Sequence, residues 1–457
     1  METTIAQIVE EFIHKLVKQL VTGKALSEFE KYAMREMETC TAKLTSAYME
    51  HLDRVIAADK VGRRKAGYAI ERRGDERKLQ LAFGDVYYHR TYYRKESGGY
   101  EYLVDSTMDI GHHQRISEWL GLSLANAAKD MPYAKVARHV GRRAISNQSV
   151  MKWVRESTVD KTEEGTLLRR VPEIHIDADE AHITLCDGKR TEVPLISVYE
   201  GIGHHGKRHF CKSVFHVSEY GKTPDSLWEQ AASELTNRYD LDGTRIYLHG
   251  DGAPWIRTGL EWLPGALFVL DKYHKNKAIT AMTAGLDNNR RDKAEYRIRK
   301  ALNEEDLDYF ALIRDNLCQE IPERAEIIIK NAEYLEKLVK GVSICTRDPG
   351  ANNGGCTEPH VSHVLSSRLS SRPMVWSKKT LQKLAPVLAA GKASSVGKSK
   401  TESMVNLAKP LRKTIARANK SFYREGTLGL PMPEAIGRLP ITGKVTGLQV
   451  VLKHYAN

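Results

Sequence analysis

The order of strand and helix patterns between residues 172 and 271 restricts the fold more than any other feature of this chain. Short runs of apolar and β-branched residues alternate with turn signals such as Asp187-Gly188, and this is typical of strands joined by tight turns. The expected elements are strands at 174–185, 193–199 and 209–217, a helix at 223–235, a strand at 244–248, a short helix at 256–260 and a strand at 266–270.

Three antiparallel strands, a helix, a parallel strand, a helix and a last strand form the order of a ribonuclease-H-like domain. The predicted fold class is therefore an α/β core with a mixed five-stranded sheet. Asp177 and Asp179 lie on one face of its first strand, because strand side chains alternate. Asp251 directly follows the fourth strand, which lies beside the first in this fold. The carboxylates of the first strand are thus expected to lie close to Asp251.

A third carboxylate follows much later in the chain. Glu358 begins a helix that is expected to run to about residue 369, after a glycine-rich loop at 349–355. Clustered carboxylates repel one another and are stable mainly when cations neutralise them. Mg²⁺, or Mn²⁺ in its place, suits such a site and can drive phosphoryl transfer on nucleic acid. Each acid also has a plainer interpretation: Asp251 as a turn residue, Glu358 as a helix-dipole partner, and Asp177 as a surface residue.

Several other side chains are candidates for the same region. His274 follows Asp271 at i+3, and Arg368 and Arg372 lie within or just after the Glu358 helix. The arginines are expected to hold DNA phosphate, with a surface salt bridge as the alternative. A zinc site among the histidines is not indicated, because none of the six cysteines forms a C-x-x-C pair.

Residues 116–156 have a helix-turn-helix pattern. Helices are expected at 116–128 and 133–140, residues 141–144 break the second, and Ser146 can cap a third. In that motif the capped helix enters the DNA major groove. Its reading side chains would be Asn147, Gln148 and Lys152. An ordinary pair of packed helices explains the pattern equally well.

The rest of the chain is helical or basic. Residues 3–58 have helical periodicity, 65–105 predict a tyrosine-rich β-hairpin, and 275–341 predict charged helices inserted before Glu358. Residues 378–420 contain eleven Lys or Arg and one acid, which favours a phosphate-binding arm over a solvated helix. The net charge of +12 favours a polyanionic partner, although a basic surface without a partner is also consistent with it.

These patterns divide the chain into seven regions. They are an N-terminal helical region (1–64), a β-hairpin region (65–110), the helix-turn-helix (111–157), the first part of the core (171–280), the helical insertion (281–350), the last core helix (351–377) and a basic C-terminal region (378–457). A mainly helical DNA-binding part thus precedes the α/β core. The absence of a signal peptide or an apolar span favours a cytoplasmic protein with no membrane contact.

Three stretches resemble the ISLre-type insertion-sequence transposases, a DDE class distantly similar to mutator-type enzymes. They are residues 176–182, residues 249–255 with 270–275, and the long segment 356–377. The family tends to have Glu at the position of Asp177 and often Gly at that of Pro359, so this chain departs from it twice.

The resemblance implies a ribonuclease-H-like domain that uses Mg²⁺ to cut and join DNA at element ends. Asp179, Asp251 and Glu358 would bind the metal, with Asp177 as a substitute, and Asp271 and His274 would support the site. The protein would act on the nucleoid as a homo-oligomer holding two DNA ends. The alternatives are a metal-dependent nuclease without strand transfer and a catalytically inactive DNA-binding regulator.

Overall fold

The computed structural model describes residues 5–22, 25–140, 145–159, 168–206, 208–391, 395–396 and 409–428. It divides into two compact units, residues 1–120 with 398–457 and residues 121–397. Within the described ranges, no helix combines the length and the apolar character that crossing a membrane requires.

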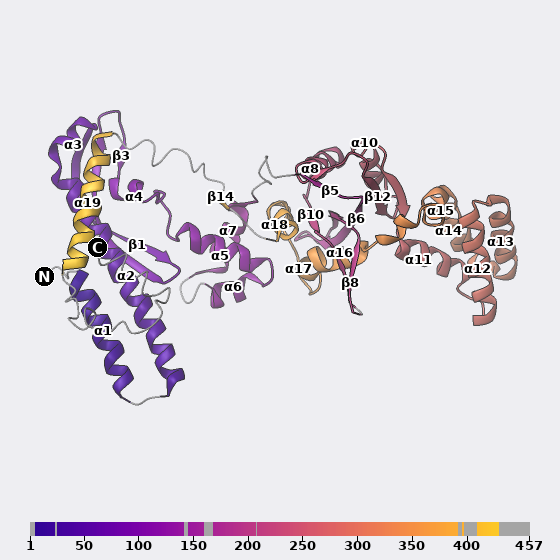
Figure 1. Ribbon diagram of the computed structural model, residues 1–457, viewed down its shortest axis with the longest axis horizontal. Coiled ribbons are helices and arrows are strands. Elements are labelled where there is room, and N and C mark those ends of the chain that lie inside the picture. Colours follow the sequence, from indigo (N-terminus) through magenta and orange to yellow (C-terminus); the bar gives the residue numbers. More distant parts are fainter. Residues whose placement is uncertain are drawn as a thin grey trace, which may run out of the picture. The chain divides into compact units, whose positions relative to one another are not determined.

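The first unit combines long helices with a small antiparallel sheet, in which β2 pairs with both β1 and β3. Residues 82 and 83 form the tight connection between β1 and β2 of the predicted hairpin. The elements are α1 (Ile5–Val21), α2 (Leu26–Ala58), α3 (Lys60–Lys65), β1 (Tyr68–Leu81), β2 (Gly84–Lys95), β3 (Tyr100–Glu101), α4 (Leu103–Thr107) and α19 (Lys409–Leu428) (Figure 1).

Two tyrosines of this sheet belong to its core. Tyr88 and Tyr93 are fully buried among apolar residues of α2 and α4. The Tyr88 hydroxyl donates a hydrogen bond to Asp105, which also pairs with the buried Arg77 at 2.6 Å. A buried carboxylate is tolerated because several donors satisfy it. These two tyrosines therefore cover the sheet and are not available to stack on bases.

The helix α19 packs against α2, from the opposite end of the sequence (Figure 1). Leu411 and Ala418 are fully buried in the same apolar cluster as α2. The Tyr48 hydroxyl donates to the Asn419 side chain at 2.9 Å, and Tyr48 contacts the ring of Phe422 edge-on. This part of the predicted basic region is thus integrated into the first unit. Residues 397–408 and 429–457 lie outside the described residues.

A five-stranded mixed sheet forms the centre of the second unit, in the order β10-β7-β6-β12-β13. The strands β10, β7 and β6 are antiparallel neighbours, whereas β12 runs parallel to both β6 and β13. The strands are β6 (Glu173–Thr184), β7 (Arg190–Tyr199), β10 (Phe215–Val217), β12 (Arg245–Gly250) and β13 (Leu267–Leu270).

The two faces of β6 differ in chemistry. Ile174, Ile176 and Ala178 point to one face and pack with the fully buried Trp228 of α8 (Pro224–Thr236). Thr223 caps α8 by accepting a hydrogen bond from the amide of Ser226. The alternate positions carry polar side chains and face the candidate site.

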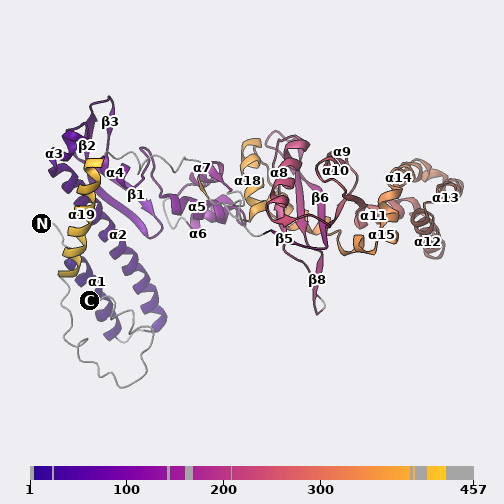
Figure 2. The ribbon, with the colours of Figure 1, turned by 45° about the horizontal axis from the view of Figure 1, so that its top comes forward.

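The predicted third strand at 209–217 is wrong as one element. Only β10 joins the sheet, while β8 (Ile202–His205) and β9 (Arg208–Cys211) form a separate antiparallel hairpin. Ser213 interrupts the run because its φ of 51° is incompatible with extended backbone. The hairpin projects from the sheet in both ribbon views (Figures 1 and 2).

Helices complete the second unit. Those that follow β13 have an apolar core of their own, which contains the buried residues Ile298, Phe310 and Leu335. The helices are α5 (Glu118–Ala128), α6 (Tyr133–His139), α7 (Asn147–Glu156), α9 (Pro254–Arg257), α10 (Gly259–Trp262), α11 (Lys272–Thr283), α12 (Asn288–Glu304), α13 (Leu307–Glu320), α14 (Ala325–Lys337), α15 (Val339–Arg347), α16 (Thr357–Val361), a π-helical turn (Ser362–Ser366), α17 (Ser367–Leu369) and α18 (Lys378–Ala390). Short strands are β4 (Ser157–Thr158), β5 (Arg169–Arg170), β11 (Tyr239–Asp240) and β14 (Ser395–Val396), with 3₁₀ turns at Pro322–Arg324 and Pro349–Asn353.

Candidate active site

Two of the predicted carboxylates come level where β12 ends beside the middle of β6. In the parallel register of β6 and β12, His249 pairs with Asp177. Two residues further along each strand direction, Asp251, which directly follows β12, comes opposite Asp179 of β6. The two side chains interact electrostatically, since the charge of Asp251 raises the pKa of Asp179. The strand register therefore brings these two acids together.

Asp179 is destabilised as an anion. Its pKa is raised to about 6, chiefly by burial and to a lesser extent by the charges of Glu180 and Asp251. The amide of Glu180 opposes this by donating a hydrogen bond to Asp179 Oδ1 at 2.8 Å, and His274 opposes it by its charge. A partly desolvated carboxylate beside a second carboxylate is a place where a cation is favoured.

Glu180 is an acid that the sequence analysis did not select. Its Oε2 accepts a hydrogen bond from Trp255 Nε1 at 2.9 Å, and burial raises its pKa, with a further contribution from Asp251. It lies directly after Asp179 in the strand and thus points to the other face of β6. That Glu180 lies close to the candidate site follows from its position next to Asp179 in the sequence. Its contact with Trp255 has no such signal in the sequence.

Asp271 and His274 link the end of β13 to the same region. Asp271 Oδ2 caps α11 by accepting from the amides of Tyr273 and His274, and Oδ1 accepts from Thr357 Oγ1 at 3.0 Å. A hydrogen bond with Asp271 raises the pKa of His274, and the nearby Asp179 and Asp251 add to it. The carboxylates thus favour the protonated form of His274, and the Thr357 contact ties Asp271 to the Glu358 helix.

Asp177 does not suit its predicted role as a substitute metal ligand. It is 1% exposed, and its oxygens accept hydrogen bonds from the Tyr199 hydroxyl at 3.1 Å and from the amide of Cys356 at 2.8 Å. His360 Nδ1 lies 3.2 Å away. Because its oxygens are occupied by protein donors, Asp177 fixes the start of α16 against β6.

Buried aromatic and imidazole rings surround Asp177. His175 Nδ1 is 3.0 Å from His249 Nε2, and the His175 ring stacks against Tyr199 and Tyr247. Burial lowers the pKa of His249 to about 4, so that it is neutral at physiological pH. The sequence analysis missed this layer. Its signal was the polar residue at every second position of β6 and β12.

The glycine-rich segment crosses this layer closely. A Cβ atom at Gly354 would lie 2.3 Å from His175 Nδ1 and 2.5 Å from His249 Nε2, and one at Gly350 would lie 2.6 Å from the Tyr247 hydroxyl. Only glycine allows the backbone to approach so closely. The segment then enters α16, where Glu358 stands exposed in the first turn.

The three carboxylates do not form a ready metal centre. Across the described ranges, no group of three or more His, Cys, Asp or Glu side chains could hold a metal ion. Asp179 and Asp251 interact, whereas the helix that carries Glu358 is linked to this region through its neighbours, by the hydrogen bond from Thr357 to Asp271. The three-carboxylate site stays a prediction.

Cys356 and Cys211 meet at the base of the β8–β9 hairpin. A hydrogen bond from the Cys211 thiol lowers the pKa of Cys356 to about 7, and the same contact raises that of Cys211. Both cysteines are free and half-buried. The contact joins the hairpin to the start of the Glu358 helix.

The predicted reading helix α7 is available at its N-terminus. Ser146 caps it by accepting from the amide of Ser149 at 3.1 Å. Asn147, Gln148 and Lys152 are exposed, whereas Trp153 packs closely against Gly121 of α5. Residues 141–144, the predicted turn of the motif, lie outside the described residues.

The two arginines after Glu358 differ. Arg368 is 6% exposed, its Nε donates to the carbonyl of Ala128 at 2.7 Å, and its guanidinium lies over the Trp376 ring. Its predicted contact with DNA phosphate is therefore corrected to a packing role. Arg372 is exposed and can still make that contact.

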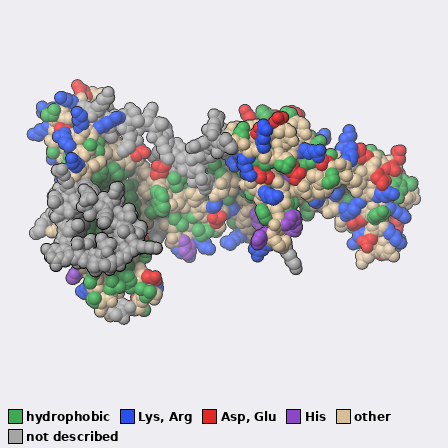
Figure 3. Space-filling view, viewed as in Figure 1, with side chains coloured by type: hydrophobic (Ala, Val, Ile, Leu, Met, Phe, Trp, Pro, Cys, Tyr) green, Lys and Arg blue, Asp and Glu red, His purple; other side chains and the backbone are tan. Residues whose placement is uncertain are grey.

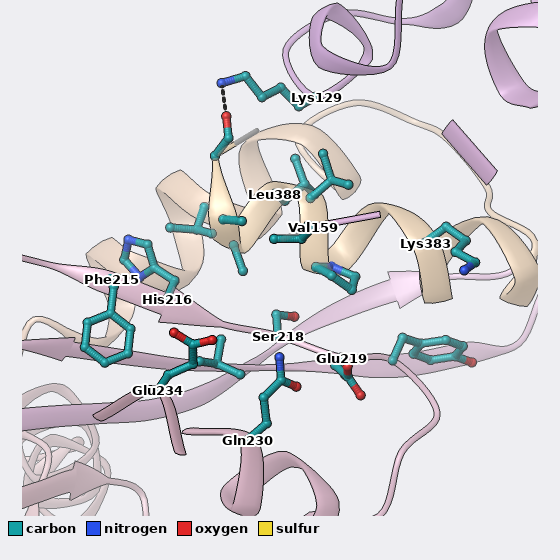
Figure 4. A pocket seen from close by; sticks show the side chains of 18 of the residues that line it. Lys129, Val159, Phe215, His216, Ser218, Glu219, Gln230, Glu234, Lys383 and Leu388 are labelled. Atoms are coloured by element: carbon teal, nitrogen blue, oxygen red, sulfur yellow. Dashed lines mark hydrogen bonds between the residues drawn. The ribbon is translucent and has the colours of Figure 1, made fainter. Parts of the chain in front are cut away.

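A groove with a volume of about 1140 Å³ lies beside α18 and β10, away from the predicted site residues. Lys129 and Lys383 line it together with Glu219 and Glu234, and Lys129 donates to the carbonyl of Gly391 at 2.7 Å (Figure 4). Its mixed charge indicates no particular class of ligand.

Comparison with known proteins gives one family. A model described as "Uncharacterised protein family (UPF0236)" matches residues 19–404. The UPF0236 protein TTE2489 of Caldanaerobacter subterraneus subsp. tengcongensis is 35% identical over 345 residues, 74% of this chain and 72% of that protein. A UPF0236 protein of the same organism whose name joins eleven locus designations, from TTE0033 to TTE2212, is 35% identical with the same coverage.

Proposed function

Because the chain belongs to the UPF0236 family, whose description states no activity, we propose a function from its site: a DNA transposase that cuts and joins strands at the ends of an insertion sequence. One observation carries the proposal. Asp179 lies in β6 beside Asp251, which follows the parallel strand β12, and the pKa of Asp179 is raised to about 6 by burial and by nearby acids. Such acids are typical of phosphoryl-transfer sites that use cations.

The sheet supports a ribonuclease-H-like assignment. Its order β10-β7-β6-β12-β13 has antiparallel β10, β7 and β6, and β12 runs parallel to β6 and β13. Asp179 lies on the central strand of this arrangement and Asp251 follows its parallel neighbour. This is the position that the proposed chemistry requires.

The donor set fits Mg²⁺. Sites for this ion often use one or two carboxylates and complete the shell with water and substrate phosphate. Asp179 and Asp251 supply the two carboxylates, and Glu358 would be the third. When bound, Mg²⁺ or Mn²⁺ would activate an attacking oxygen and stabilise the leaving one.

The remaining residues position the site and the DNA. Asp177 and Thr357 hold the start of α16, and His274, whose protonated form the neighbouring acids favour, would offset their negative charge. On DNA, Asn147 and Gln148 would read bases of the terminal sequence, while exposed cations such as Lys152 and Arg372 would contact phosphates.

The proposed reaction has two steps. Water first attacks a phosphodiester at the element end and releases a 3′-hydroxyl. That hydroxyl then attacks a phosphodiester of the target DNA, so that one bond forms as another breaks. Two DNA ends must be held together, which requires a homo-oligomer.

The comparisons supply one independent support. The name of one relative joins eleven loci of a single genome. Many copies of one protein in a genome are what an element that duplicates itself leaves behind. A metal-dependent nuclease of the same fold would share the acids, but its activity would not explain why the gene is present in many copies.

The decisive experiment uses labelled duplexes that carry the DNA flanking the gene, incubated with the full chain, target plasmid and Mg²⁺. We expect strand-transfer products with wild-type protein and none with Asp179→Asn. The matched control is Asp242→Asn, an exposed acid in the loop before β12, which should retain activity.

Each other result selects a different function. Cleavage without joining would identify a nuclease. Sequence-specific binding without metal-dependent cleavage would identify a regulator, an alternative favoured by the unassembled three-donor group. Normal strand transfer by Asp179→Asn would refute the proposed role of this carboxylate.

A further inference from the structure

The β8–β9 hairpin has an unusual composition for a surface loop. Between residues 201 and 212 the sequence has three Lys or Arg, three His, one Phe and no Asp or Glu. Its described residues beyond Gly203 are exposed, apart from the half-buried Cys211 at its base. The histidines stand out on this projection in the space-filling view (Figure 3). No part of the proposed catalysis uses this hairpin.

The register of the hairpin sorts its side chains onto two faces. His205 pairs with Arg208 and Gly203 with Phe210 on one face, so that a cation stands beside the aromatic ring. A Cβ atom at Gly203 would lie 2.6 Å from Phe210 Cζ, so glycine makes the room that the ring occupies. Although the end of the ring covers Gly203, 51% of Phe210 remains exposed. The ring is held in place and still presents a free surface.

The cations of the hairpin are also free to act. Arg208 and Lys212 are exposed, and neither takes part in an ion pair among the contacts of the described residues. On the other face, the rings of His204 and His209 meet at 4.5 Å. A surface with several cations, no acids and a positioned aromatic ring is complementary to a polyanion that has aromatic faces.

The base of the hairpin is anchored at the candidate active site. β8 begins three residues after Tyr199, whose hydroxyl donates to Asp177 and accepts from the amide of Gly355. β9 ends at Cys211, whose thiol contacts Cys356, two residues before Glu358. A ligand on the hairpin therefore lies next to the segment that begins the Glu358 helix.

We propose that the β8–β9 hairpin binds an unpaired DNA strand next to the cleavage site, with a base stacked on Phe210 and phosphates on Arg208 and Lys212. This inference rests on the proposed action on DNA. Unpaired DNA fits better than a duplex, because the faces of paired bases are already stacked on one another. Transposition would supply such a strand wherever the element end is opened.

The test measures the binding of the full chain in EDTA by fluorescence anisotropy. The probes are a labelled single strand, a forked duplex and a blunt duplex of about 20 nucleotides. Phe210→Ala should weaken binding of the first two by about 5- to 100-fold, the range for one lost base stack. Binding of the blunt duplex should change less than about twofold.

Three variants sharpen the result. Phe210→Tyr keeps a ring and should bind like wild type. Tyr296→Ala removes a 69% exposed aromatic from α12, far along the chain, and should change nothing. Arg208→Gln should reduce the slope of log affinity against log salt by about 0.7 for the single strand.

Several outcomes would overturn the proposal. They are unchanged single-strand binding by Phe210→Ala, an equal loss in Tyr296→Ala, or binding of a polyglutamate peptide as tight as that of the single strand. Because EDTA prevents metal-dependent cleavage, the binding measurement can fail or succeed separately from the strand-transfer assay. If the wild-type protein joins DNA strands but Phe210→Ala binds the single strand normally, only the proposed role of the hairpin is refuted. If single-strand binding requires Phe210 but the wild-type protein never cleaves DNA, only the proposed transposase activity is refuted.

Discussion

Replacing Asp179 by Asn should stabilise the metal-free protein while abolishing the proposed DNA cleavage. Asn keeps an oxygen that can accept the hydrogen bond from the amide of Glu180, but it removes the charge that burial and Asp251 disfavour. Raising a carboxyl pKa from 3.8 to about 6 corresponds to about 3 kcal/mol. Because the side chain is only half-buried and water screens it, we expect a gain of about 1–2 kcal/mol.

This stabilisation depends on pH in a defined direction. The folded chain keeps the Asp179 proton up to about pH 6, whereas the unfolded chain loses it near 3.8. The favourable contribution of the protonated acid is complete below pH 3.8 and is lost as the pH rises through about 6. Asp179→Asn should therefore exceed wild type at pH 8 and approach it near pH 4.

Thermal unfolding in EDTA measures the effect. At roughly 2–4 °C per kcal/mol, Asp179→Asn should raise the Tm at pH 8 by about 2–8 °C. Asp242→Asn should not change it, because Asp242 is exposed. Mg²⁺ should raise the Tm of wild type more than that of Asp179→Asn, because a cation bound to the folded state stabilises it. A variant that melts below wild type at pH 8, or a difference that persists at low pH, would refute the reasoning.

Three further predictions concern packing and DNA. Gly354→Ala should cost about 1–3 kcal/mol and abolish cleavage, because the new Cβ would lie 2.3 Å from His175 Nδ1; a structure of the variant with an unmoved Glu358 helix would contradict this. Arg368→Ala should cost about 2–4 kcal/mol in urea unfolding without changing the salt dependence of DNA binding, whereas the exposed Arg372→Ala should do the reverse. Gln148→Ala should weaken binding of the element end by about 1–3 kcal/mol in a competition assay and leave random DNA unaffected.

The sequence predicted the bounds of an element well where the spacing of apolar residues within that element determines which of its side chains are buried. The apolar positions of β6 and the cap of α8 are local signals, and the structure has these elements within about a residue of their predicted bounds. The run from 209 to 217 was different. Its residues are extended on both sides of Ser213, whose φ is positive, and the part before Ser213 pairs with residues 202–205, outside the run.

The site was less predictable because its residues act through distant partners. Asp177 and Asp179 have the same spacing and face, yet one is saturated by Tyr199 and the start of α16 while the other meets Asp251. Arg368 has the composition of a phosphate contact, but its environment is set by Ala128, 240 residues earlier. Such differences appear only when long-range packing is known.

The packing of α19 on α2 has a consequence for synthesis. While the ribosome produces residues 60 to 400, the surface of α2 around Tyr48 has no partner, because Leu411 and Phe422 do not yet exist. The first unit to emerge is therefore the last to be finished. A chain stopped before residue 409 would contain the complete five-stranded sheet of the second unit but would lack α19 in the first. The apolar α2 side chains that α19 covers would then be exposed and prone to aggregation.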